Sequence, residues 1–162
     1  MITYKKLAEL ASKFISKSKV LKYGFNLSPM YRRTSAKVVY ISEDFLTIQI
    51  KLPFSYKNTN YVNTIFGGSM FSAVDPFPMT QLMNLIGDDY VVWDKAAEIY
   101  FRRPAREDLY ADFIYTLEEL DEIKQKAQEQ NEFEIVKTTK LTNKDTVPYT
   151  YLTLHNKKII TI

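Results

Sequence analysis

The sequence predicts an α+β protein in which an antiparallel sheet wraps around one long buried helix. Apolar residues occupy nearly every face of the run 66–86, as is typical of a helix surrounded by protein. Most other apolar runs have the composition and alternation of strands, and two short polar segments join them as hairpins. The chain of 162 residues is 46% hydrophobic, so we expect a single domain over residues 1–162.

An amphipathic helix is predicted at the N-terminus, over about residues 3–17. Apolar side chains recur there at helical spacing from Leu7 to Ile15, with lysines between them. We expect this helix to cover the sheet rather than to lie on a membrane surface, because its apolar face is modest and lacks Trp. Residues 20–35 mix apolar, basic, Gly and Pro residues and predict an irregular connection.

Six runs are rich in β-forming residues and predict strands: 37–41, 45–52, 90–103, 111–117, 133–141 and 147–162. The second run alternates between apolar and polar residues, which indicates a strand with one buried face. Thr116 and Glu119 form a capping box that opens an extra surface helix over about residues 117–130. Its apolar stripe is narrow and consists of Leu117, Leu120, Ile123 and Ala127.

The long central helix is predicted over about residues 67–86, with a break. Pro76 and Pro78 would each remove a helix hydrogen bond, at a cost of about 3 kcal/mol in a helix interior. We therefore expect one segment to end near Val74 and a second to begin with Asp75 as its N-cap and Pro76 as its first residue.

Composition excludes several kinds of site. The net charge of +3 is too small to indicate nucleic acid as a partner, and the absence of cysteine excludes disulfides and thiolate metal ligands. No metal site is expected, because His155 is the only histidine and lies far in sequence from any acidic cluster. No apolar segment approaches the ~20 residues that cross a bilayer, and no signal peptide is evident, so we expect a cytoplasmic protein without membrane insertion.

Two of the four glycines, Gly67 and Gly68, stand side by side at the start of the central helix. A glycine pair lets the backbone approach a ligand or another chain, and a helix start offers N–H groups that suit a developing negative charge. Asp75 follows among apolar residues, which makes it a candidate for a raised pKa.

Asn60-x-x-Asn63-x-x-Phe66-Gly67-Gly68 resembles the N-x-x-G-x-x-H-G-G signature of hotdog-fold acyl-CoA thioesterases of the PaaI-like group. Asp75, nine positions after Phe66, stands where that group keeps its catalytic acid, and residues 100–105 resemble its F-x-R-P-A strand end. The closer likeness, over about residues 36–162, is to the uncharacterised DUF4442 proteins, which similarly have T-I-F-G-G. Phe66 replaces the motif histidine and Asn63 replaces its glycine. Of the catalytic groups that the resemblance implies, Asp75 and the amides of Gly67 and Gly68 therefore remain.

The resemblance implies a hotdog fold and hydrolysis of an acyl-CoA or acyl-carrier thioester. Such hydrolysis needs N–H donors for the oxyanion, here Gly67 and Gly68, and a base or nucleophile, here Asp75. Along one helix Asp75 lies about 10 Å from Gly68, so a site would pair the glycines of one subunit with the acid of another. We therefore expect a homodimer, with a tetramer as the alternative.

The further candidates for contact with substrate are Asn60, Asn63, Phe66, Arg102, Arg103 and Arg106. The arginines match the phosphates of coenzyme A, which would be part of the substrate, and no other cofactor is expected. For several of the site residues a structural role stays open: solvated basic residues at a strand end, a loop-stabilising Asn60, glycines that serve packing, and Asp75 as a cap. A non-catalytic acyl-CoA-binding protein and an interaction scaffold are the alternative functions.

Overall fold

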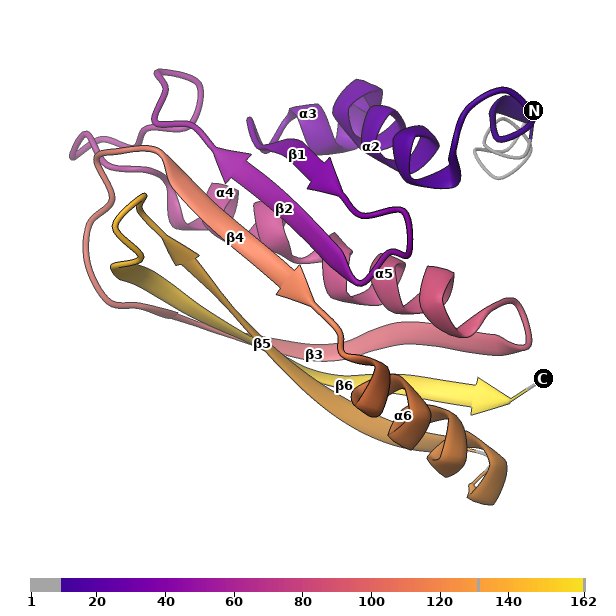
Figure 1. The fold of residues 1–162 in the computed structure, drawn as a ribbon. Helices are drawn as coiled ribbons and strands as arrows, with labels where there is room; N and C mark the ends of the chain where they lie inside the picture. The colour runs from indigo at the N-terminus through magenta and orange to yellow at the C-terminus, as the bar shows by residue number, and fades with distance from the viewer. Residues whose placement is uncertain (1–9, 131, 162) are drawn as a thin grey trace.

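The structure of the chain is a computed structural model that describes residues 10–130 and 132–161. Its strands form one six-stranded antiparallel sheet in the order β1-β2-β4-β5-β6-β3. They are β1 (Lys37–Ile41), β2 (Thr47–Leu52), β3 (Tyr90–Phe101), β4 (Leu109–Ile114), β5 (Glu132–Thr142) and β6 (Pro148–Thr161). Figure 1 shows this sheet curving around the central helix pair. The predicted α+β class and antiparallel sheet are confirmed.

The helices are α2 (Lys17–Leu27), α3 (Pro29–Arg32), α4 (Gly67–Val74), α5 (Pro76–Ile86) and α6 (Leu117–Glu129). The irregular connection predicted over 20–35 is wrong, because most of that segment is helical. Gly24 is tolerated inside α2, and Pro29 takes the first position of α3, where a missing N–H costs little. Residues 3–9 of the N-terminal helix predicted over about 3–17 lie outside the described residues. Over residues 10–17 the prediction is wrong in extent, because only residues 10 and 11 are helical before a turn, and a separate helix, α2, begins at Lys17.

Side-chain hydrogen bonds fix α2 and α3 against the rest of the fold. Asn26 donates to the Val38 carbonyl and accepts from the Val38 N–H, both at 2.9 Å, so α2 is tied to edge strand β1. The buried Tyr31 hydroxyl donates to the Ala73 carbonyl at 3.0 Å, and its burial raises the pKa of the phenol. The second contact joins α3 to α4.

The break in the central helix lies where the two prolines predict it. α4 ends at Val74 and α5 begins at Pro76, with Asp75 between them. Asp75 occupies the N-cap position, but its backbone is α-helical and its side chain makes no capping hydrogen bond to α5, so the expected capping role is not observed. Phe77, in the first turn of α5, is fully buried against the rings of Phe25, Tyr31 and Phe113, at centroid distances of 4.9–5.3 Å.

The strands agree with the predicted pattern except at their ends. In β2, Ile48, Ile50 and Leu52 are buried, as the alternation predicts. Phe45, predicted to begin that strand, lies instead in the preceding turn with φ of 61°. The strand predicted over 111–117 runs from Leu109 to Ile114, since the Thr116 capping box starts α6 directly afterwards.

α6 is the predicted surface helix, and both hydrogen bonds of its capping box are present. Leu120, Ile123 and Ala127 are buried, as expected. Leu117 is not part of this stripe, because its side chain is 64% exposed. Among the described residues, no helix combines the length and the apolar character that crossing a membrane requires.

One surface ion pair gives the folded state a defined pH dependence. Lys51 Nζ lies 2.6 Å from Asp108 Oδ2, and the Phe54 N–H donates to Asp108 Oδ1 at 2.9 Å. The hydrogen bond from Lys51 lowers the pKa of Asp108 below its usual value, and the bond from Phe54 acts in the same direction. The ionised carboxylate therefore contributes stability above the unfolded-state pKa of about 3.9, and the contribution is lost as pH falls through the lower folded-state pKa.

We predict that Asp108→Asn lowers the free energy of unfolding at neutral pH by less than about 1 kcal/mol, because both side chains are partly solvated. The asparagine keeps an acceptor for Phe54 and removes only the charge. Urea denaturation of both proteins should show the difference shrinking as pH falls below the unfolded-state pKa and lost once pH is below the folded-state pKa as well. Asp121→Asn on the exposed face of α6 is the control, and a difference for Asp108→Asn that persisted in acid would contradict the assignment.

Candidate active site

The loop before α4 is held in place by backbone and side-chain hydrogen bonds. The Ile65 N–H donates to the Ala105 carbonyl and the Phe66 N–H to the Asn58 carbonyl, both at 2.8 Å. Asn58 is buried, and its side chain donates to the Pro53 carbonyl at 2.8 Å and accepts from the Ser55 N–H at 3.1 Å. The loop therefore delivers the start of α4 to a fixed position beside the segment that follows β3.

Asn60 and Asn63 shape the same loop in different ways. Asn60 Oδ1 accepts from the N–H groups of Val62 and Thr64 at 3.1 Å, and its Nδ2 donates to the Thr64 hydroxyl at 2.9 Å. The loop-stabilising role considered for Asn60 is thus present in the structure. Asn63 is exposed and has φ of 57°, a left-handed conformation that asparagine tolerates and glycine adopts freely. The backbone explains why asparagine can stand at the motif's glycine position.

Two aromatic rings occupy the space that side chains at Gly67 and Gly68 would fill. A Cβ on Gly67 would lie 2.8 Å from the Phe101 ring, and one on Gly68 would lie 2.3 Å from the Phe66 ring. Both rings are about half exposed, at 57% for Phe66 and 52% for Phe101. The N–H groups of Gly67 and Gly68 have no acceptor within α4, as at any helix start. The pair thus combines close packing with N–H donors that the helix itself does not use.

A cavity of about 480 Å³ opens beside this helix start. Its walls include Asn60, Gly67, Phe101 and Met70, together with Arg102, Arg103 and Arg106 from the segment after β3. The structure therefore brings together five of the predicted site residues: Asn60, Gly67, Arg102, Arg103 and Arg106. The other four, Asn63, Phe66, Gly68 and Asp75, do not line this cavity.

Two of the three arginines lie on tyrosine rings rather than against carboxylates. The guanidinium of Arg102 is 5.4 Å from the centre of the Tyr151 ring, and that of Arg103 is 5.6 Å from the centre of the Tyr149 ring. All three guanidinium-bearing residues are exposed, and within the described residues none forms an ion pair. Their donors are therefore available to an anion, and stacking on tyrosine orients two of the planar groups.

Asp75 lies half-buried between α4 and α5, with its own N–H donating to the Phe71 carbonyl at 3.0 Å. It follows Gly68 by seven residues, so the two positions are about 10 Å apart along the helix axis. Within one chain the acid and the arginine-lined cavity are separate features.

Sequence reasoning missed several residues of this region. The sequence indicates Phe101 only as part of a strand and of the F-x-R-P-A likeness, and it indicates no role for Asn58, Tyr149 or Tyr151. The two tyrosines alternate along β6, which places them on one face, but only the pairing of β3 with β6 brings them to the arginines. The sequence contains no signal for that pairing partner.

The fold resembles solved structures that include thioesterases. A Pseudomonas aeruginosa protein described as of unknown function and a probable thioesterase matches with a TM-score of 0.77 at 15% identity, over 89% of this chain and 95% of that one. A Haemophilus influenzae thioesterase matches with a TM-score of 0.59 at 11% identity, over 99% and 92% of the two chains. A mutant thioesterase enzyme of Staphylococcus aureus gives 0.60 at 12% identity, over 82% and 99%. At such identities the likeness shows the shared fold.

Residues 17–154 match the family described as Domain of unknown function (DUF4442), and the chain belongs to that family. This confirms the resemblance found in the sequence. No curated protein matches the chain.

The two asparagines of the loop give a matched pair of variants. We predict that Asn60→Ala lowers the free energy of unfolding by about 1–3 kcal/mol, because the N–H groups of Val62 and Thr64 lose their acceptor. Asn63→Gly should change it by less than about 0.5 kcal/mol, since glycine adopts the left-handed backbone without strain. Urea denaturation measures both, and equal losses for the two variants would contradict this division of roles.

Proposed function

We propose that this protein is a hotdog-fold thioester hydrolase acting on acyl-CoA or a related acyl-carrier thioester, with its sites at a homodimer interface. The observation that carries the proposal is the helix start at Gly67 and Gly68, which opens beside a cavity bordered by arginines without carboxylate partners. The N–H groups would serve the oxyanion and the arginines the phosphates of coenzyme A. The thioesterases among the similar structures support the same chemistry.

The exposed edge of β3 supports the dimer. β3 pairs with β6 on one side, and within the described residues no strand covers its other side along 12 residues. The opposite edge strand, β1, is tied to α2. β3 also carries the partly exposed apolar residues Val91, Trp93 and Phe101. A long apolar edge is a template for another strand, and a second copy would cover it and bring the partner's acid toward the glycines.

The proposed reaction follows from these groups. The carboxylate of Asp75 from one subunit takes a proton from water as the water oxygen attacks the thioester carbonyl carbon. The developing oxyanion accepts hydrogen bonds from the amides of Gly67 and Gly68 of the other subunit. Collapse of the tetrahedral intermediate breaks the carbon–sulfur bond, and the proton passes to the leaving thiolate. Direct attack by Asp75 on the carbonyl carbon is the alternative first step.

A specific observation favours a second candidate, a non-catalytic acyl-CoA-binding protein. The ring of Phe66 packs on Gly68, at the position where the resembled signature has a histidine. An apolar ring cannot donate a hydrogen bond to a thioester oxygen or to the loop. Binding could therefore persist in this protein without turnover.

The first test replaces the acid. We predict that Asp75→Asn lowers kcat for the best acyl-CoA of a panel by at least about 100-fold, because proton transfer by a positioned carboxylate contributes on that order. Free-thiol detection measures turnover, and Asp121→Asn is the matched control. Unchanged turnover would remove Asp75 from the chemistry. An active monomer by sedimentation would contradict the interface, and binding of a non-hydrolysable acyl-CoA without wild-type turnover would favour the second candidate.

A second prediction concerns the arginines. Replacing Arg102, Arg103 and Arg106 singly by Ala should raise KM for an acyl-CoA by roughly 5- to 20-fold each, the worth of a partly solvated charged hydrogen bond. The same variants should leave turnover of the matching acyl-pantetheine unchanged, because that substrate lacks the nucleotide phosphates. Lys144→Ala in the β5–β6 turn controls for net charge. Equal losses on both substrates would show that these side chains do not bind phosphate.

A further inference from the structure

The sheet opens between two of its central strands. β4 pairs with β2 at all six of its residues, from Leu109 to Ile114, but with β5 at one position only, Tyr110 opposite Thr142. β5 continues paired with β6 along its length. Figure 1 shows β4 and β5 diverging toward α6. Beyond Tyr110, the edge of β4 that faces β5 therefore has no strand partner among the described residues.

A second cavity, of about 430 Å³, fills this opening and shares no lining residue with the arginine cavity. Its walls come from α5, β4, α6 and β5, and include Gln81, Asp112, Tyr115, Glu119, Lys137 and Thr139. Asp112 and Glu119 contribute two carboxylates, Lys137 contributes an ammonium group, and Gln81 contributes an amide. The cavity is thus polar although it lies inside the sheet.

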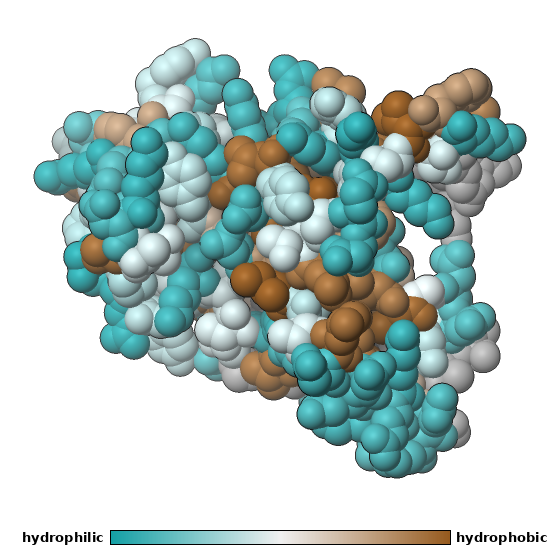
Figure 2. All heavy atoms as spheres, in the orientation of Figure 1, coloured by the Kyte–Doolittle hydropathy of each residue, from teal (hydrophilic) through white to brown (hydrophobic). Residues whose placement is uncertain are grey.

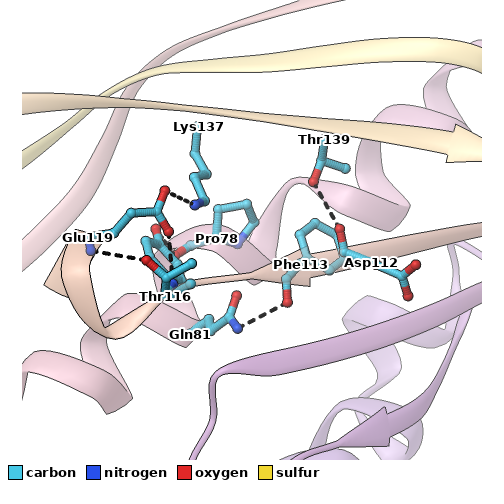
Figure 3. A network of polar contacts seen from close by, with 9 residues as sticks. Pro78, Gln81, Asp112, Phe113, Thr116, Glu119, Lys137 and Thr139 are labelled. Carbon is cyan, nitrogen blue, oxygen red and sulfur yellow. Dashed lines mark hydrogen bonds and ion pairs between the residues drawn. The ribbon is translucent and has the colours of Figure 1, made fainter.

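Gln81 supplies a fixed and unused acceptor at this cavity. Its side chain is fully buried, and its Nε2 donates to the carbonyls of Phe45 at 2.8 Å and Phe113 at 3.2 Å. Turning the amide over would place its oxygen against two carbonyl oxygens, so the orientation is determined. Oε1 is buried and has no hydrogen-bond partner among the described residues. Figure 3 shows this oxygen pointing away from the Phe113 carbonyl, on the side of Glu119 and Lys137.

The neighbouring donors are only loosely engaged. The Thr139 hydroxyl donates to the Asp112 carbonyl and the Tyr115 hydroxyl to the Pro78 carbonyl, each at a long 3.4 Å. Lys137 Nζ bonds Glu119 Oε1 at 2.6 Å and lies 4.3 Å from the centre of the Tyr115 ring, which leaves further N–H donors on the ammonium. A ligand could redirect these donors at little cost, whereas the Gln81 oxygen lacks a donor altogether.

The outer mouth of the cavity carries two apolar side chains beside the exposed polar residues Asp112 and Thr138. Ile114 and Val136 line it from the two strands and are 53% and 56% exposed. Leu117, at the start of α6, follows Ile114 by three residues and is 64% exposed. Figure 2 shows hydrophobic surface gathered next to the strongly hydrophilic α6. The opening therefore leads from apolar side chains at the surface to polar groups at its floor.

We infer that this opening is a binding site for a small uncharged molecule that carries a primary carboxamide on a short apolar stem. The amide N–H groups would meet Gln81 Oε1 and the free edge of β4, and its carbonyl would accept from Thr139 or Lys137. A planar amide matches a strand edge, which presents alternating donors and acceptors. A carboxylate is disfavoured by Gln81 Oε1 and by the carboxylate of Glu119, and the Lys137–Glu119 ion pair is neutral overall, so it offers a cation no net attraction. The apolar stem would lie between Ile114 and Val136.

Butyramide is the probe. Titration into ¹⁵N- and methyl-labelled protein should shift the side-chain NH₂ of Gln81, the amide of Thr139 and the methyl groups of Ile114 and Val136, with a Kd on the order of 1 mM for so small a ligand. N,N-dimethylbutyramide lacks the N–H donors and should bind at least about tenfold more weakly, and so should butyrate. Equal binding of all three compounds would overturn the inference.

Variants test the location without disturbing the anchors of Gln81. Val136→Trp should fill the mouth and abolish the shifts, whereas Val39→Trp, at another exposed strand valine, should leave them unchanged. Thr139→Val removes one donor and should weaken binding by about tenfold at most, with the fold retained. Absence of shifts at Gln81 with butyramide at about 100 mM, with only exchanging water detected there, would show a hydrated cavity and overturn the inference.

Discussion

The burial of Phe77 is the constraint on which the rest of the structure depends. Its ring contacts the rings of Phe25 in α2, Tyr31 in α3 and Phe113 in β4. This one side chain therefore connects the N-terminal helices and the sheet to the central helix. A fully buried aromatic ring is worth several kcal/mol relative to a small side chain. With α5 fixed under β4, the start of α4 must lie beside the end of β3, where Ile65 bonds Ala105 and Gly67 meets Phe101.

The glycine pair shows that packing and chemistry need not compete for the same atoms. The positions that a Cβ would occupy face the rings of Phe101 and Phe66, to the side of the helix. The N–H groups of a first helical turn point instead along the helix axis, toward its N-terminal end. The rings therefore account for why Gly67 and Gly68 lack side chains, and they lie to the side of the direction in which the donors point. The packing role of the glycine pair is therefore compatible with its proposed role as a donor of hydrogen bonds to an oxyanion.

Local rules predicted much of this fold, and pairing between distant segments explains what they missed. The alternation in β2, the proline break after Val74 and the capping box at Thr116 each depend on neighbouring residues, and each is observed. The stacking of Arg102 on Tyr151, 49 residues apart in sequence, depends instead on the register of strands β3 and β6, which composition does not encode. For the same reason the sequence identified the arginines as candidates but not their tyrosine supports.

A contact from α6 spans the opening between β4 and β5. The opening lies along β4 itself, after Tyr110, and the helix begins three residues after that strand ends. Glu119 then performs two tasks: one carboxylate oxygen accepts from the Thr116 N–H at 2.9 Å, and the other accepts from Lys137 of β5 at 2.6 Å. Burial acts to raise the pKa of Glu119, but these hydrogen bonds outweigh it and the pKa is lowered, so the group stays ionised. A charged contact from a helix cap thus takes the place of ladder hydrogen bonds. It bridges the space between β5 and α6, and the buried amide of Gln81 borders the same space.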